Sequence, residues 1–250
     1  ITSEKYRRNR VPPVKIDLPD CYAINDEVVL YDYQGPILAK MIGAKRALCS
    51  MVVGSGKTVL SIGGIKYIDP KSVLIVGPKS IAEQWQGELA KLINKDSVIL
   101  SSKNIDGFIT SNDAVGICTY QFFNRHAIAL TAKRYDLVIL DEIQYIRNDE
   151  SKTWTAAAHL DTEYLWGLSG TIIENRLDDM YNIMEVIQPG YLGPKWKFDS
   201  KFKRFKSLHK TKVLYYNEVK SLKELKALIA PYIFSYDNLK LPKLNHDFKT

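Results

Sequence analysis

The chain has 250 residues, of which 46% are hydrophobic and 25% charged, and its formal net charge is +7. These values exclude a disordered, collagen-like or coiled-coil chain and are typical of a globular protein with one large domain. No apolar run approaches the roughly 18 residues needed to cross a bilayer, so we expect no membrane partner. The three cysteines are far apart and in no metal-ligand spacing, which favours a reducing compartment over a disulfide framework.

Apolar runs alternate with helical patterns along most of the chain, which indicates parallel strands joined by crossover helices. Several runs are continuous rather than alternating, as expected for strands that are covered on both faces. We predict strands at Ala47–Val53, Ser72–Val76, Ala114–Thr119, Leu137–Leu140 and Tyr164–Ser169. We predict helices at Thr58–Tyr67, Ile81–Ile93, Leu177–Ile187 and Ser221–Ile229.

A phosphate-binding loop is indicated by Gly54-Ser55-Gly56-Lys57-Thr58, which lies between a predicted strand and a predicted helix. Glycines let backbone N–H groups curl around phosphate oxygens, and the following helix presents its positive N-terminus to the same anion. Lys57 would reach the β- and γ-phosphates of a nucleotide, and the Thr58 hydroxyl would coordinate Mg²⁺. The strict Walker pattern has a glycine where this chain has Met51.

An acidic pair, Asp141-Glu142, directly follows the predicted strand at Leu137–Leu140. A carboxylate at the carboxyl end of a buried strand is well placed to hold Mg²⁺ beside the phosphate loop, and Glu142 could then orient or activate the attacking water. Taken alone, such a pair is more often a helix N-cap followed by a favourable first-turn acid. Together with the phosphate loop, it favours a nucleoside triphosphatase.

Basic residues concentrate near the end of the chain. They are Lys195, Lys197, Lys201, Lys203, Arg204, Lys206, Lys210 and Lys212. With one acid, Asp199, the segment has a net charge of +7, equal to that of the whole chain. Phe198, Phe202 and Phe205 follow the i, i+4, i+7 spacing of one helical face, so we expect a helix with the aromatic rings inward and the cations outward. Its basic face is either an ordinary solvated surface or a surface that binds nucleic-acid phosphates.

Further segments occur in a characteristic order around these two motifs. They are Leu30-Tyr31-Asp32-Tyr33-Gln34, Val73 to Trp85, Thr119-Tyr120, Tyr145 to Asn148 and Leu168 to Asn175. From about Leu30 to Asp237 the chain resembles helicase superfamily 2, with its motifs Q, I, Ia, Ib, II and III, and specifically the Swi/Snf-like branch. Ser169-Gly170-Thr171 separates this branch from the DEAD-box RNA helicases, which have Ser-Ala-Thr. Trp85 by itself is expected to be a core or helix-face anchor.

The resemblance implies an α/β fold, namely a RecA-like parallel sheet flanked by helices (a P-loop NTPase lobe) with a helical protrusion. We accordingly expect an N-terminal extension at 1–29, the RecA-like ATP-binding lobe 1 at 30–194, a helical basic protrusion at 195–237, and a linker toward a missing second lobe at 238–250. That second lobe, in the same full-length chain or in a partner chain, would supply arginines that stabilise the transferred phosphoryl group.

The resemblance also implies roles for individual residues. Gln34 would read the adenine base, beside a phosphate loop formed by Gly54, Ser55, Gly56, Lys57 and Thr58. Ser169, Gly170 and Thr171 would couple the nucleotide site to DNA. The residues expected to contact DNA are Pro78, Lys79, Thr119, Tyr120, Lys201 and Arg204.

The implied function is the ATP-binding lobe of an ATP-dependent double-stranded DNA translocase, with ATP and Mg²⁺ as cofactors and duplex DNA as partner. We predict that the 250-residue chain alone binds ATP weakly and hydrolyses it poorly. Two alternatives remain open, an RNA-dependent ATPase or helicase and a degenerate scaffold lobe that binds nucleic acid; retention of Lys57, Asp141 and Glu142 argues against the scaffold. We expect an intracellular protein, cytoplasmic if bacterial, archaeal or viral and nuclear if eukaryotic.

Overall fold

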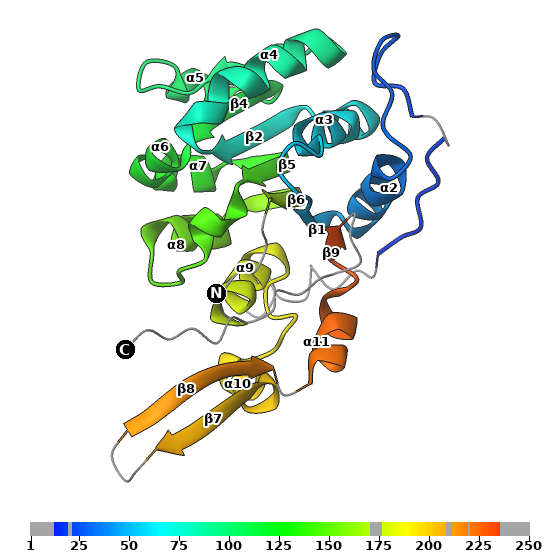
Figure 1. Ribbon diagram of the computed structural model, residues 1–250. Coiled ribbons are helices and arrows are strands. Elements are labelled where there is room, and N and C mark those ends of the chain that lie inside the picture. Colours follow the sequence, from blue (N-terminus) through cyan, green and yellow to red (C-terminus); the bar gives the residue numbers. More distant parts are fainter. Residues whose placement is uncertain (1–12, 20–21, 171–176, 209–211, 220, 236–250) are drawn as a thin grey trace.

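The computed structural model describes residues 13–19, 22–170, 177–208, 212–219 and 221–235. Its main feature is a seven-stranded sheet in the order β3-β4-β2-β5-β6-β1-β9, in which neighbouring strands all run parallel (Figure 1). The strands are β1 (Arg46–Ser50), β2 (Ser72–Gly77), β3 (Val98–Ile99), β4 (Ala114–Thr119), β5 (Arg134–Asp141), β6 (Asp161–Ser169) and β9 (Ile233–Ser235). The parallel sheet is thus confirmed, although the strand predicted at 47–53 ends at Ser50.

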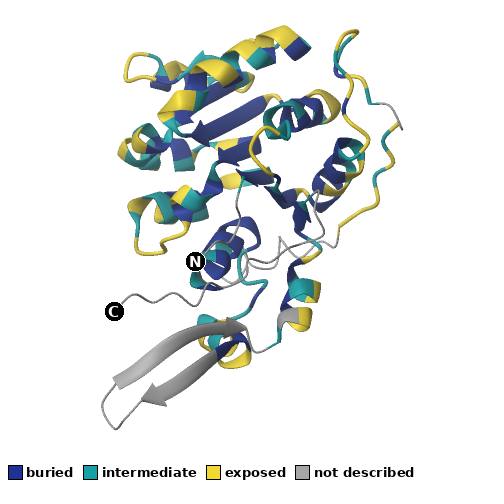
Figure 2. Ribbon diagram, in the orientation of Figure 1, coloured by how far each residue is buried: buried dark blue, intermediate teal, exposed yellow. Residues whose placement is uncertain are grey.

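Helices cover both faces of the sheet, in two groups whose members contact one another (Figure 1). One group is α2 (Gln34–Ala44), α3 (Lys57–Ile68) and α4 (Ala82–Ile93), and the other is α6 (Tyr120–Arg125), α7 (Ala127–Ala132), α8 (Lys152–Ala158) and α9 (Leu177–Ile187). Figure 2 shows the central strands as buried, and all six residues of β2 are buried, which explains their continuous apolar sequences. Among the described helices, none has both the length and the apolar character to cross a membrane.

The order of the strands brings the motifs to one edge of the sheet. β6 lies between β1 and β5, and the register pairs Ser50 with Ser169 and Asp141 with Leu168. On the other side of β5, β2 and β4 end together, because Gly77 pairs with Thr119. The carboxyl ends of these five strands therefore form a single edge, where parallel α/β sheets bind their ligands.

The segment after Gly190 differs from the continuous helix that the phenylalanine spacing predicts. Helix α10 (Lys195–Phe202) ends at Phe202, and β7 (Lys203–Leu208) and β8 (Lys212–Val219) form an antiparallel hairpin that extends away from the main sheet (Figure 1). Helix α11 (Leu222–Ile229) then leads to β9, which pairs with β1 in the main sheet. The prediction of one helix across the basic segment is therefore wrong beyond Phe202. The protrusion contains a hairpin as well as helices.

Ion pairs centred on a buried lysine, Lys203, connect the base of the hairpin to α9. The ammonium of Lys203, a residue 8% exposed, lies 2.7 Å from Asp178 Oδ1 and 2.8 Å from Asp199 Oδ1. Lys195 Nζ also contacts Asp178 Oδ1, at 2.5 Å. Part of the positive charge of this segment is therefore neutralised within the chain, which weakens the case for a uniformly basic face.

Candidate nucleotide site

The phosphate loop has the backbone that its glycines predict. Gly54 and Gly56 have φ values of +81° and +78°, which side-chain-bearing residues rarely adopt, and α3 begins immediately after, at Lys57. The Lys57 ammonium donates hydrogen bonds to the carbonyl oxygens of Met51 (3.0 Å) and Val52 (3.4 Å). The lysine therefore lies within its own loop, at the N-terminus of the following helix.

Gln34 joins the loop from α2 and is 1% exposed. Its Oε1 accepts a hydrogen bond from the Tyr31 N–H (2.9 Å), while its Nε2 donates to the carbonyl oxygens of Ser55 (3.1 Å) and Gly56 (3.4 Å). The Tyr33 hydroxyl donates to the same Ser55 oxygen, at 3.0 Å. Tyr33 and Gln34 therefore stabilise the phosphate loop through hydrogen bonds to its carbonyl oxygens. The binding of adenine by Gln34 stays a prediction.

Asp141 lies at the end of β5 and is 6% exposed. Its Oδ1 accepts a hydrogen bond from the Glu142 N–H and its Oδ2 accepts one from the Trp85 indole Nε1–H, both at 2.9 Å. Burial raises the pKa of Asp141, although both hydrogen bonds and the charge of Lys57 favour the ionised form. Glu142 has φ +51°, an unusual conformation for a residue other than glycine and one that is common at functional sites.

Glu142 is connected to the end of β6 through one glutamine. Gln144 Nε2 donates to Glu142 Oε2 (2.7 Å), and the hydroxyl of fully buried Ser169 donates to Gln144 Oε1 (2.9 Å). Gly170 lies beside the phosphate loop, because a Cβ on it would be 3.9 Å from Lys57 Nζ. The expected coupling segment thus contacts both motifs, although Thr171 lies outside the described residues. Gln144 had no predicted role, although it directly follows the acidic pair in Asp141-Glu142-Ile143-Gln144.

The residues expected to contact DNA at the sheet edge differ in exposure. Lys79 is exposed and Pro78 half-buried, where β2 passes into the short helix η1 (Lys79–Ile81). Thr119 caps α6, because its hydroxyl accepts a hydrogen bond from the Phe122 N–H at 3.1 Å. Tyr120 is buried, and its hydroxyl donates to the carbonyl oxygen of Asp141 at 2.9 Å. The Tyr120 side chain therefore faces the interior, toward the acidic pair.

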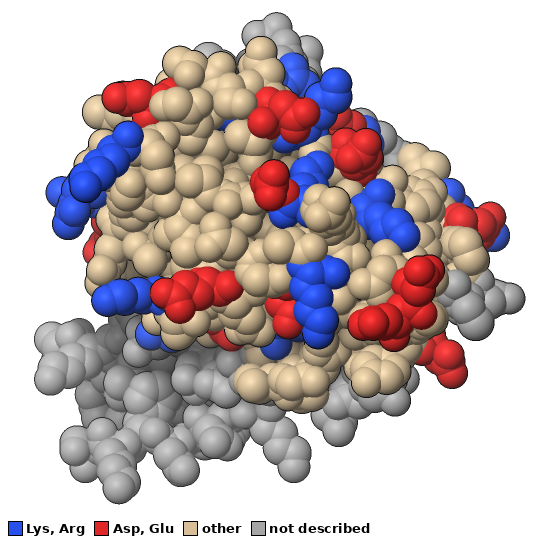
Figure 3. Space-filling view, turned by 90° about the horizontal axis from the view of Figure 1, so that it is seen from above, with Lys and Arg blue, Asp and Glu red and all other residues tan. Residues whose placement is uncertain are grey.

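The two expected DNA contacts from the basic segment lie away from this edge. Lys201 Nζ is 3.0 Å from Glu224 Oε2 and 5.2 Å from the centre of the Phe202 ring. Arg204 lies in β7, and its side chain is outside the described part of the structure. On the face seen in Figure 3, basic and acidic side chains are interspersed and neither sign forms a continuous patch. A role for Lys201 and Arg204 in binding DNA stays a prediction.

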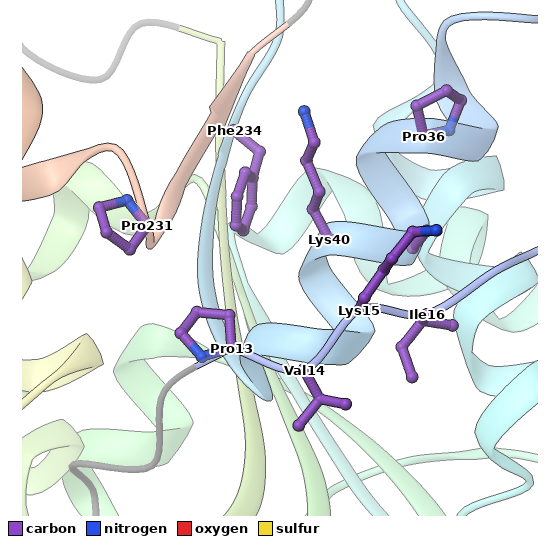
Figure 4. Close-up of a pocket in the computed structure, with 9 residues that line it drawn as sticks. Pro13, Val14, Lys15, Ile16, Pro36, Lys40, Pro231 and Phe234 are labelled. Atoms are coloured by element: carbon purple, nitrogen blue, oxygen red, sulfur yellow. The ribbon is translucent and has the colours of Figure 1, made fainter.

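A separate apolar pocket of about 450 Å³ lies between the N-terminal segment, α2 and the start of β9 (Figure 4). Its lining includes Pro13, Val14, Ile16, Pro36, Pro231 and Phe234. Neither the phosphate loop nor the acidic pair contributes to this lining, so the pocket is distinct from the candidate nucleotide site.

Comparisons with known proteins agree with this geometry. The chain is 27% identical over 174 residues to Switch 2 of Arabidopsis thaliana, covering 58% of this chain and 19% of that protein. It is 27% identical over 181 residues to the uncharacterized ATP-dependent helicase YqhH of Bacillus subtilis, covering 68% and 31%. It is 28% identical over 182 residues to the DNA repair and recombination protein RAD54B of Gallus gallus, covering 67% and 20%. The chain thus spans less than a third of the length of each of these relatives.

Solved structures and a family model complete the comparison. The Sulfolobus solfataricus SWI2/SNF2 ATPase core in complex with dsDNA aligns with a TM-score of 0.69 over 90% of this chain and 46% of that one. At 24% identity, this likeness shows a shared fold. The model of the SNF2-related domain matches residues 40–245, which is most of the chain. The chain therefore belongs to the SNF2-related family, the Swi/Snf-like ATPases of helicase superfamily 2, as the order of its motifs predicts.

Proposed function

We propose that this chain is the first, ATP-binding lobe of an ATP-dependent motor that moves along double-stranded DNA. The observation that carries the proposal is the convergence, at one sheet edge, of the phosphate loop after β1, the acidic pair after β5 and Ser169-Gly170 after β6. A degenerate scaffold would have no need to keep Lys57, Asp141 and Glu142 together at this edge.

The phosphate loop and the helix that follows it, α3, fit a nucleoside triphosphate. The positive φ of Gly54 and Gly56 curls the loop backbone, and the N-terminus of α3 favours negative charge; the Ser55 N–H donates to the Val52 carbonyl oxygen at 3.2 Å and would turn to a phosphate oxygen instead. Lys57 would exchange its hydrogen bonds to Met51 and Val52 for bonds to the β- and γ-phosphates. Phosphate binding would therefore replace contacts that Lys57 and Ser55 make within the loop, at residues that already lie at the N-terminus of α3.

The acidic pair fits a magnesium ion and an attacking water. Asp141 and Thr58 offer a carboxylate and a hydroxyl, the oxygen ligands that Mg²⁺ prefers, and a cation would offset the cost of burying Asp141. When bound, the ion neutralises charge on the phosphates. The contact between Gln144 Nε2 and Glu142 Oε2 orients the Glu142 carboxylate, which would position the attacking water and accept its proton.

The partners of this lobe follow from its relatives. The solved neighbour holds duplex DNA, and this chain covers 46% of it. The resemblance to the Swi/Snf-like branch implies a second RecA-like lobe, which would face this edge and supply the arginines that stabilise the developing charge. Duplex DNA would lie along the ends of β2 and β4, where Lys79 is exposed.

The test is ATP hydrolysis by the full-length gene product with duplex DNA, single-stranded DNA, RNA or no nucleic acid. We expect stimulation mainly by duplex DNA. Glu142→Gln should lower the rate of DNA-stimulated ATP hydrolysis by a factor of about 100 or more, since positioned general bases contribute that much. Glu150→Gln, the same chemical change at an exposed residue, is the matched control. Stimulation mainly by RNA would favour an RNA-dependent ATPase, and no stimulation by any nucleic acid would refute a motor.

A further inference from the structure

Asp141 is held at three of its atoms by three different side-chain or backbone donors. The Trp85 indole N–H contacts Oδ2, the Glu142 backbone N–H contacts Oδ1, and the Tyr120 hydroxyl contacts the main-chain carbonyl oxygen, each at 2.9 Å. Trp85 is 1% exposed and Tyr120 is 5% exposed, so water does not compete for these bonds. Both carboxylate oxygens of Asp141 and its main-chain carbonyl are therefore held in place before any ligand binds.

The two aromatic donors come from separate parts of the fold. Trp85 lies in the first turn of α4, which follows β2, and Tyr120 is the first residue of α6, which follows β4. Core packing alone would explain two buried rings, but it would not direct both polar atoms to the same aspartate. An indole N–H is a donor only, so its single hydrogen bond is committed to the Asp141 carboxylate.

We propose that Trp85 and Tyr120 are positioning residues for Asp141. Trp85 sets the rotation of the carboxylate, so that an oxygen lone pair is presented to the magnesium ion of bound nucleotide, and Tyr120 fixes the backbone that carries it. Residues that orient a metal ligand in this way typically affect metal affinity by 10–100-fold. The inference rests on the proposed function, because it assumes that Asp141 binds the magnesium of ATP.

The chain offers a matched control for each residue. Trp166 is also fully buried, and its Nε1–H has no hydrogen-bond partner among the described residues, so Trp166→Phe leaves a comparable cavity without removing a hydrogen bond. Tyr135 is fully buried, and its hydroxyl donates to the Leu130 carbonyl oxygen at 2.9 Å, far from the acidic pair in the fold. Tyr135→Phe therefore matches Tyr120→Phe in both burial and the type of bond that is lost.

The experiment measures the affinity of the 250-residue chain for a fluorescent ATP analogue, once with Mg²⁺ and once with EDTA. The readout is the enhancement of affinity by Mg²⁺, which is independent of turnover and of any second lobe. Trp85→Phe should reduce this enhancement about tenfold, while Trp166→Phe leaves it unchanged. Tyr120→Phe should reduce the enhancement by less than Trp85→Phe does, because Tyr120 contacts the backbone of Asp141 rather than its carboxylate, and Tyr135→Phe should match the wild type.

The outcomes separate the inference from the proposed function. If the wild-type chain binds the analogue equally well with and without Mg²⁺, the proposed magnesium site and this inference both fail. If Mg²⁺ enhances wild-type binding but Trp85→Phe and Trp166→Phe give the same enhancement, the inference alone is overturned. Thermal unfolding checks that each variant is folded. Should Trp85→Phe not fold, Tyr120→Phe, which removes a single oxygen atom, decides the question in the same assay.

Discussion

Replacing Gly56 with alanine should destabilise the chain more than the same replacement of Gly54, although both glycines have positive φ. At Gly54 a Cβ would meet no atom within 4 Å, so the variant bears only the cost of a left-handed backbone. At Gly56 the Cβ would lie 2.6 Å from Gln34 Nε2, well inside contact distance. The difference between the two variants therefore reports how tightly Gln34 is packed against the phosphate loop.

The structure gives the magnitude. A left-handed backbone costs an L-residue about 1–2 kcal/mol, which is the whole effect expected for Gly54→Ala. Gly56→Ala must also displace the Gln34 amide and break its hydrogen bonds to Ser55 and Gly56, each worth about 1 kcal/mol. Because Gln34 is 1% exposed, water cannot easily replace the hydrogen bonds that its amide loses. The expected loss for Gly56→Ala is about 3–4 kcal/mol.

Urea unfolding without nucleotide, followed by circular dichroism, measures both losses, and equal slopes would show that the unfolded states are comparable. A double variant with Gln34→Ala provides the cycle. Once the amide is absent, Gly56→Ala should cost about as much as Gly54→Ala, which corresponds to a coupling energy of about 2 kcal/mol. Losses for the two single variants within about 0.5 kcal/mol of each other would refute the reasoning, because the contact with Gln34 would then contribute nothing.

Two further variants test how α9 is held. Arg46→Met should lower the free energy of unfolding by about 2–4 kcal/mol, because the buried guanidinium donates to the last carbonyl oxygens of α9, Ile187 O (2.6 Å) and Val186 O (3.0 Å). Burial also lowers the pKa of Arg46 to about 10, and removing the buried charge offsets part of the loss. A loss under about 1 kcal/mol in urea unfolding would contradict this expectation. Lys203→Met should cost about 1 kcal/mol at neutral pH, a value discounted for the partial exposure of Asp178. Burial opposes ionisation of Asp178, but hydrogen bonds from lysines outweigh it and hold its pKa below its ordinary value, so this contribution is lost as pH falls toward that pKa. A difference from wild type that stays constant between about pH 7 and pH 3 would contradict the ion pair.

The strands and the two nucleotide motifs were predictable because their signals are local. A glycine-rich loop between an apolar run and a helical pattern needs only its immediate neighbours to be recognised. Strand β2 and the Leu137–Leu140 part of β5 are buried, apolar runs because helices cover both faces of the sheet. The prediction of one continuous helix across the basic segment was wrong because it, too, used only local spacing. Phe198 and Phe202 do share a helix, but the spacing of Phe205 fitted a helical period by chance, and a short segment supports a helix or a strand equally well until its partner strand is known.

The sequence by itself determined the fold class and the family, since the motifs follow one another along the chain in a characteristic order. It also determined the positions of Lys57, Asp141 and Glu142, since each motif is recognised within a few residues. Only the tertiary structure decided which side chains meet there. Trp85 is 56 residues and Tyr120 is 21 residues from Asp141, and both reach it because β2 lies between β4 and β5 in the sheet. No spacing in the sequence contains that order of strands, because it results from how the crossover helices pack against the sheet as a whole.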